Sequence, residues 1–213
     1  MASAAAIALA VLTVCFATLR VHLKGGNQCE MTWSRPSYRP MATATTNSNT
    51  TDATDCYRLL HYVDGFSGFT AESPPKFDPD RLPLLFVPGH LGSHLQVRSL
   101  GVTMVELEAP IDVYTLDFTH TVTAVHGSLL WEQASHIVDA IAAIRAQYPA
   151  PAPPVTIVGH SYGGLAARAA VMVPGFVPDS VRNIFTLGTP HPRPPYPLDA
   201  SISRVHDTVN AYW

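Results

Sequence analysis

Short apolar runs alternate with stretches of helical periodicity over the second half of the chain. Turn residues bound four of these runs, which are predicted strands at 82–87, 111–118, 155–158 and 184–187. Apolar residues at helical spacing predict helices over about 128–148 and 165–173. Strands and helices that alternate in this order are typical of βαβ units. The pattern therefore predicts an α/β fold for 81–213, with a mostly parallel sheet and helices on both of its faces.

The longer of the two predicted helices has its own start and stop signals. Ser128 is a favourable N-cap residue, and the prolines within 149–154 end the helix. Its predicted buried face consists of Leu130, Ala134, Ile137, Val138, Ile141 and Ile144.

The first 24 residues form a separate apolar segment, which we expect to be helical. Residues 2–19 carry no charge, and the basic residues Arg20 and Lys24 follow them. A run of this length is either a signal anchor or the apolar part of a cleaved signal peptide. Its basic flank favours a cytoplasmic C-terminal side, which opposes export, whereas the glycosylation sequon at Asn49 is consistent with a lumenal location. Both alternatives direct the chain to the secretory membrane system.

Residues 25–80 precede the predicted α/β domain and contain a polar insertion at 41–55. This insertion has almost nothing to bury, so we predict a flexible surface segment. In an oxidising lumen Cys29 and Cys56 either form a disulfide or remain two free thiols, and Cys15 lies within the apolar segment.

Composition excludes several classes of function. The 213 residues are 47% hydrophobic and 14% charged, with a net charge of -3, which does not fit a disordered charged tail. Lys and Arg nowhere form a stripe that could follow phosphates, so we expect no nucleic-acid partner. CxxC and HExxH spacings are absent, so we expect no metal and no cofactor. A folded enzyme or a folded binding module remains.

A nucleophile motif directly follows the third predicted strand. The sequence GHSYG at 159–163 matches GxSxG between a strand and a helix, where a sharp turn exposes the serine Oγ above the carboxyl edge of the sheet. The backbone N–H of Tyr162 would then face a developing oxyanion. The motif predicts Ser161 as a nucleophile, with a chance match in a glycine-rich turn as the alternative. For His160 we expect a structural role.

A second oxyanion donor is expected from the loop after an earlier strand. The sequence PGHLGS at 88–93 occupies that place, and its glycines let the backbone turn its amides inwards. We expect the N–H of Leu91 or of His90 to be this donor. His126 is a candidate to line the same pocket, with an ordinary structural role as the alternative, and His191 is a candidate to line the acyl or headgroup site.

The acid and the histidine of a catalytic triad have no suitable positions after Ser161. Asp179 precedes the fourth predicted strand, and His191 follows it, one strand too early. Asp199 and His206 are too close in sequence to hold a strand and a helix between them. We therefore expect the general base and its carboxylate beyond residue 213, and an α/β domain that is incomplete at its C-terminus and inactive by itself.

Several sequence blocks between Leu84 and Trp213 resemble the GPI inositol-deacylases, which are α/β-hydrolase-like serine esterases. These blocks are LFVPGHLGSHLQVRSL, VYTLDF, TAVHGSLLWEQASHIVDAI, VTIVGHSYGGLAARAA, GFVPDSVRNIFTLGTPHPRPP and VNAYW, in the family's order. The sequence CEMTW at 29–33 is similar to the family's lumenal start, whereas Thr119-His120-Thr121 replaces the family's acidic pair.

This resemblance implies an enzyme of the endoplasmic reticulum membrane whose catalytic part is lumenal. Such an enzyme removes the acyl group, usually palmitoyl, from the inositol of GPI lipid or GPI-anchored proteins, and Ser161 falls on the family's nucleophile. It also implies a chain truncated after the nucleophile half, as a fragment or a degenerate protein. Two alternatives remain open, namely a non-catalytic membrane-associated module that binds GPI or acyl chains, and a generic lipase or thioesterase.

Overall fold

The computed structural model describes residues 4–23, 35–43, 57–64 and 77–213, in two compact units, Met1–Trp33 and Ser34–Trp213. In the first unit, α1 (Ala4–Leu23) forms a helix in the predicted apolar segment. Within the described ranges, no helix combines the length and the apolar character that crossing a bilayer requires. Whether 1–24 is an anchor or a signal peptide stays a prediction, and Cys29, Asn49 and Cys56 lie outside the described residues.

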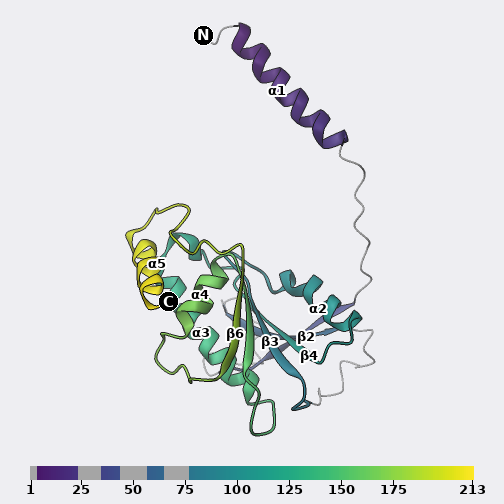
Figure 1. Ribbon diagram of the computed structural model, residues 1–213, viewed down its shortest axis with the longest axis vertical. Coiled ribbons are helices and arrows are strands. Elements are labelled where there is room, and N and C mark those ends of the chain that lie inside the picture. Colours follow the sequence, from purple (N-terminus) through teal and green to yellow (C-terminus); the bar gives the residue numbers. More distant parts are fainter. Residues whose placement is uncertain (1–3, 24–34, 44–56, 65–76) are drawn as a thin grey trace. The chain divides into compact units, whose positions relative to one another are not determined.

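The second unit is built on one six-stranded sheet in the order β1-β2-β4-β3-β5-β6 (Figure 1). The strands are β1 (Pro36–Met41), β2 (Arg58–Asp64), β3 (Leu82–Val87), β4 (Ile111–Asp117), β5 (Val155–His160) and β6 (Val181–Leu187). Neighbours among β3, β4, β5 and β6 run parallel, whereas β2 is antiparallel to both β1 and β4. The sheet is therefore mostly parallel, as predicted.

Helices cover both faces of this sheet (Figure 1). On one face lie α3 (Gly127–Arg145), α4 (Tyr162–Ala170) and α5 (Ala200–Tyr212), and the larger core cluster is packed there. On the other face α2 (Arg98–Glu106) covers a smaller cluster around Tyr62 and Val102. Two short 3-10 helices, η1 (His94–Val97) and η2 (Thr123–Val125), follow β3 and β4. The layers confirm the predicted α/β-hydrolase-like fold class.

All four predicted strands and both predicted helices are present; β3 has the predicted bounds, and the ends of the others differ. The predicted N-cap of α3 is wrong, because α3 begins at Gly127 and Ser128 lies inside its first turn. The helix gains a tertiary partner at this end, where the Gly127 N–H donates to Ser201 Oγ of α5 at 2.9 Å. The predicted face of α3 is buried except at Val138, which is half-buried.

Two strands, β1 and β2, two α-helices, α2 and α5, and both 3-10 helices were not predicted. Met41 is the last residue of β1 and pairs with Leu59 of β2, so the predicted insertion at 41–55 begins too early. Residues 44–56 of that insertion lie outside the described residues.

The parallel arrangement brings several loops to one edge of the sheet. The carboxyl ends of β3, β4, β5 and β6 all lie at this edge, because parallel neighbours point the same way. The loop 88–93, the segment 118–126, Ser161 and the loop 188–199 therefore leave the sheet on the same side.

Candidate active site

Ser161 occupies a sharp turn between β5 and α4. Its backbone dihedrals, φ 54° and ψ −128°, are unfavourable for a residue with a side chain. The surrounding chain holds it in place, because its N–H donates to the Leu187 carbonyl at 2.8 Å and its carbonyl accepts from Thr189 Oγ1 at 2.8 Å. The half-buried serine is thus fixed by β6 and by the loop that follows β6.

The small residues around Ser161 allow α4 to approach the sheet closely. A Cβ at Gly163 would overlap the carbonyl oxygen of Val87, at the end of β3. Only a residue without a side chain fits this contact between helix and strand. The strand–turn–helix geometry that GxSxG demands is therefore present around Ser161.

Gly89, in the loop after β3, lies directly beside Ser161. A Cβ at this position would stand 2.7 Å from the Ser161 Cβ and 3.2 Å from its Oγ. The glycine lets the loop 88–93 approach the serine closely. The structure thus brings together the two segments that the sequence proposed for nucleophile and oxyanion donor.

The two candidate amides of this loop differ in their partners. The Leu91 N–H donates to the Thr121 carbonyl at 3.1 Å, and the Leu91 side chain is exposed. The His90 ring has a structural contact, because its Nδ1 accepts from the Ala124 N–H at 3.1 Å. Since the Leu91 amide is already engaged, the His90 backbone N–H is the better candidate donor.

Tyr162 is the first residue of α4. The first N–H groups of a helix have no partner within the helix, so the Tyr162 amide is available to a ligand beside Ser161. Its side chain is buried, and this burial raises the pKa of its hydroxyl. The ring lies edge-on to the ring of His206, with centroids 6.1 Å apart, so the side chain belongs to the core.

Both ring nitrogens of His191 are engaged by neighbouring side chains, so neither is available as a general base. Arg168 donates to its Nδ1 at 2.8 Å, and its Nε2 lies 3.0 Å from Thr186 Oγ1. Desolvation and the Arg168 charge lower the pKa of His191, which favours a neutral ring. His191 therefore links α4, β6 and its own loop.

His126, the other candidate pocket residue, is exposed at the start of α3. Its Nδ1 lies 3.9 Å from Oδ2 of Asp199, whose carboxylate accepts from the Ser201 N–H at the start of α5. His206 is fully buried on α5. Among the described residues, no hydrogen bond joins the Ser161 Oγ to a histidine ring.

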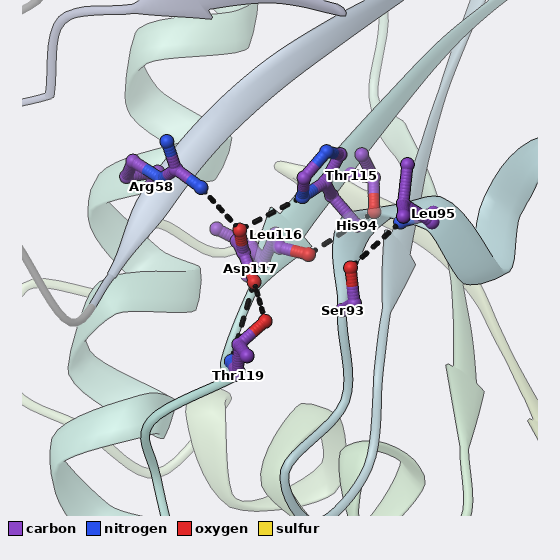
Figure 2. Close-up of polar contacts among 8 residues, drawn as sticks. All are labelled: Arg58, Ser93, His94, Leu95, Thr115, Leu116, Asp117 and Thr119. Carbon is purple, nitrogen blue, oxygen red and sulfur yellow. Dashed lines mark hydrogen bonds and ion pairs between the residues drawn. The ribbon is translucent and has the colours of Figure 1, made fainter. Parts of the chain in front are cut away.

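An Asp–His pair does occur at this edge of the sheet, but it does not serve Ser161 directly. His94 Nδ1 lies 2.8 Å from Oδ2 of Asp117, the last residue of β4 (Figure 2). The His94 ring faces Tyr38 of β1, with centroids 4.7 Å apart, and β3 separates β4 from β5. The pair therefore lies on the far side of β3 from the serine.

Asp117 is the most heavily engaged carboxylate of this edge. Burial alone would raise its pKa, but hydrogen bonds from His94, Thr119 and Arg58 outweigh that effect and lower the pKa well below its usual range. Asp117 belongs to no motif that the sequence indicated. An acidic residue at the carboxyl end of an apolar strand is the signal that could have indicated it.

One cavity of the described structure lies away from the serine. Its volume is about 490 Å³, and it lies at the opposite end of the sheet, near the start of β3 and β4. Its walls include the buried His61 and Tyr62 and the half-buried Phe77, Met104, Ile111 and Asp112. Within the described part of the chain, no group of His, Cys, Asp and Glu side chains is arranged to hold a metal ion.

A family model described as "PGAP1-like alpha/beta domain" matches residues 78–213. A GPI inositol-deacylase of Phaeosphaeria nodorum is 33% identical over 93% of this chain and 20% of its own length. The GPI inositol-deacylase of Rattus norvegicus is 31% identical over 88% of this chain and 21% of its own length. The chain thus spans about one fifth of the length of these curated relatives.

Among solved structures, the chain is similar to a dienelactone hydrolase from Anabaena variabilis. The TM-score is 0.47 with 17% identity, and the match covers 73% of this chain and 64% of that one.

Proposed function

The chain belongs to the PGAP1-like family of GPI inositol-deacylases, and from this premise we propose that its serine site hydrolyses the acyl ester, usually palmitoyl, on the inositol of GPI anchors. The observation that carries the proposal is the strained turn at Ser161 with Gly89 packed against its Oγ. The substrates are GPI lipid and GPI-anchored proteins at the endoplasmic reticulum membrane, with the catalytic part in the lumen.

In the proposed reaction, the Ser161 Oγ attacks the carbonyl carbon of the acyl ester. The backbone N–H groups of Tyr162 and His90 stabilise the negative charge that develops on the carbonyl oxygen. The general base takes the proton of the Ser161 hydroxyl and gives it to the inositol oxygen, which leaves as a hydroxyl, and the acyl group remains as an ester on Ser161. Water attacks this second ester, which releases the fatty acid and restores the serine hydroxyl.

In this proposal the general base lies outside the described residues. The ring nitrogens of His90, His94 and His191 have other partners, and His206 is buried in the core. Activated serine normally needs an imidazole within hydrogen-bond reach. The proposal therefore concerns a protein that includes such a base. The curated relatives are about five times as long as the segment that matches this chain.

The test uses Ser161→Ala in the full-length protein. The assay follows conversion of inositol-acylated GPI to the form that phosphoinositide phospholipase C cleaves. We expect the rate of this conversion to fall by at least about four powers of ten. Ser135→Ala, on the exposed face of α3, is the control and should retain full activity. Conversion by Ser161→Ala at the wild-type rate would refute the assignment.

A second candidate function is a non-catalytic module that binds GPI or acyl chains at the membrane. The absence of a histidine contact to the Ser161 Oγ among the described residues favours it. A fluorophosphonate probe separates the two functions, because it labels only an activated serine. Covalent labelling of Ser161 in the full-length protein supports the esterase, and a protein that binds acylated GPI without labelling supports the binding module.

A further inference from the structure

Two loops that leave adjacent strands are joined beside the serine. The Phe118 N–H donates to the Gly92 carbonyl at 2.8 Å, and the Leu91 N–H donates to the Thr121 carbonyl at 3.1 Å. A third hydrogen bond runs from the Ala124 N–H to the His90 ring at 3.1 Å. The loop 88–93 therefore takes its position from the segment 118–124.

Asp117 stands at the base of this pair of loops (Figure 2). Its Oδ1 accepts from the Thr119 hydroxyl at 2.5 Å and from the Thr119 N–H at 3.2 Å, which turns the chain after β4. Its Oδ2 accepts from Arg58 of β2 at 2.5 Å and pairs with His94 Nδ1 at 2.8 Å. One buried carboxylate thus contacts Thr119, at the start of the 118–124 segment, and His94, which directly follows the loop 88–93.

We propose that Asp117 is a positioning residue for the serine site: through His94 and Thr119 its carboxylate fixes two loops, one of which approaches Ser161 at Gly89 and carries the His90 amide. The inference rests on the proposed esterase function, which it deepens. Asp117 does not touch the reacting atoms, because β3 lies between its strand and β5. It acts on the oxyanion donor through the loops.

The close packing at Gly89 makes the serine site sensitive to small loop movements. Hydrogen-bond donors stabilise an oxyanion only when they lie about 2.7–3.1 Å from it, so a shift of less than 1 Å weakens the interaction. Loss of one such donor costs about 100-fold to 1,000-fold in turnover. Partial misplacement of the His90 amide should therefore cost a measurable part of that factor.

The decisive variant is Asp117→Asn in the full-length protein, which keeps the size of the side chain but removes its charge. We expect kcat to fall about 10-fold to 100-fold with KM changed less than about threefold, because only the transition state carries the oxyanion. Inhibition by an alkyl trifluoromethyl ketone, whose adduct carries an oxyanion, should weaken by a similar factor. Binding of a non-reactive ether analogue of the substrate should not change.

Asp112→Asn is the matched control, because Asp112 is a well-shielded carboxylate at the other end of β4. It pairs with Arg81 at 2.6 Å and accepts from Tyr148 at 2.7 Å. Loss of stability should be comparable in the two variants, but only Asp117→Asn should lower kcat. Equal losses of kcat in both variants would reduce Asp117 to an ordinary stabilising residue and overturn the proposal.

His94 provides a rescue test. His94→Ala removes the donor to Asp117 and should reproduce the Asp117→Asn defect, whereas His94→Asn keeps a donor near the place of Nδ1 and should restore most of the activity. A defect of the same size in both His94 variants would contradict the proposed contact.

Amide hydrogen exchange tests the inference without relying on activity. In Asp117→Asn the amides of Leu91 and Phe118 should exchange at least about tenfold faster than in wild type, and in Asp112→Asn they should not. Unchanged exchange in Asp117→Asn would overturn the positioning role. A wild-type protein that neither deacylates GPI nor reacts with fluorophosphonate would instead refute the proposed function, while the exchange result would still decide the role of Asp117.

Discussion

At the scale of single residues, the backbone of Ser161 combines strain with function. A residue in a sparsely populated backbone region costs about 1–3 kcal/mol and persists where neighbours over-determine its position. Here the contacts to Leu187 and Thr189 provide that constraint. The strain places a hydroxyl beside two loops without burying it, and a nucleophile at a sharp turn needs this placement.

The strain predicts different free energies of unfolding for two variants of Ser161 that both lack the hydroxyl. Glycine adopts positive φ without a steric cost, so Ser161→Gly should unfold with a free energy about 1 kcal/mol higher than that of Ser161→Ala. Urea unfolding of the two variants measures the difference. The entropy that glycine gains in the unfolded chain opposes the effect, so a more stable alanine variant would show that the turn stores little strain.

At the scale of elements, α4 depends on contact with the backbone of β3. Gly163→Ala would normally stabilise a helix by up to about 1 kcal/mol. At this position we expect the reverse, a loss of about 3 kcal/mol, because the new Cβ meets the rigid Val87 carbonyl. Chemical denaturation measures the change in the free energy of unfolding.

Gly175→Ala is the control for this prediction. Gly175 has φ 93° and open space around its Cβ position, so its substitution should cost only the backbone penalty of about 1 kcal/mol. If both variants lose the same stability, close packing of α4 on β3 does not explain the requirement for glycine.

The elements that the sequence predicted are those with strongly apolar runs, most of them buried; β6 is the exception, because its apolar run was recognised although none of its residues is buried. β3 and β5 are near-continuous apolar runs, as expected for strands with both faces covered. β1 was missed because its sequence, PSYRPM, contains two prolines and a half-buried pattern typical of an edge strand. The α5 helix was missed because its buried face is short, with the polar His206 among the apolar Ile202, Val205 and Val209.

The site was predictable where it depends on local sequence and not where it depends on contacts between loops. Ser161 and the loop 88–93 were found from short motifs. The choice between the amides of His90 and Leu91 depends on a hydrogen bond to Thr121, which is 30 positions away from Leu91. Asp117 gains its importance from Arg58 and His94, and no sequence spacing indicates such a meeting of three segments.

At the scale of the whole molecule, the apolar core is unevenly distributed across the sheet. The larger cluster lies under α3 and α4 and includes fully buried residues of β3, β4 and β5, whereas α2 covers a much smaller one. β1 pairs with β2 alone and is only half-buried. The central strands therefore form the most stable part of the described structure, and β5 leads directly into Ser161.

This distribution predicts unequal amide hydrogen exchange. Amides of β3 and β5 should exchange only through global unfolding, since each of these strands is paired on both sides. Amides of β1 should exchange at least about tenfold faster through local opening. Mass-spectrometric exchange on the full-length protein measures both, and β1 amides as protected as those of β5 would contradict the prediction. Because Ser161 directly follows the slowly exchanging β5, we expect the proposed nucleophile to keep its position when the β1 edge opens.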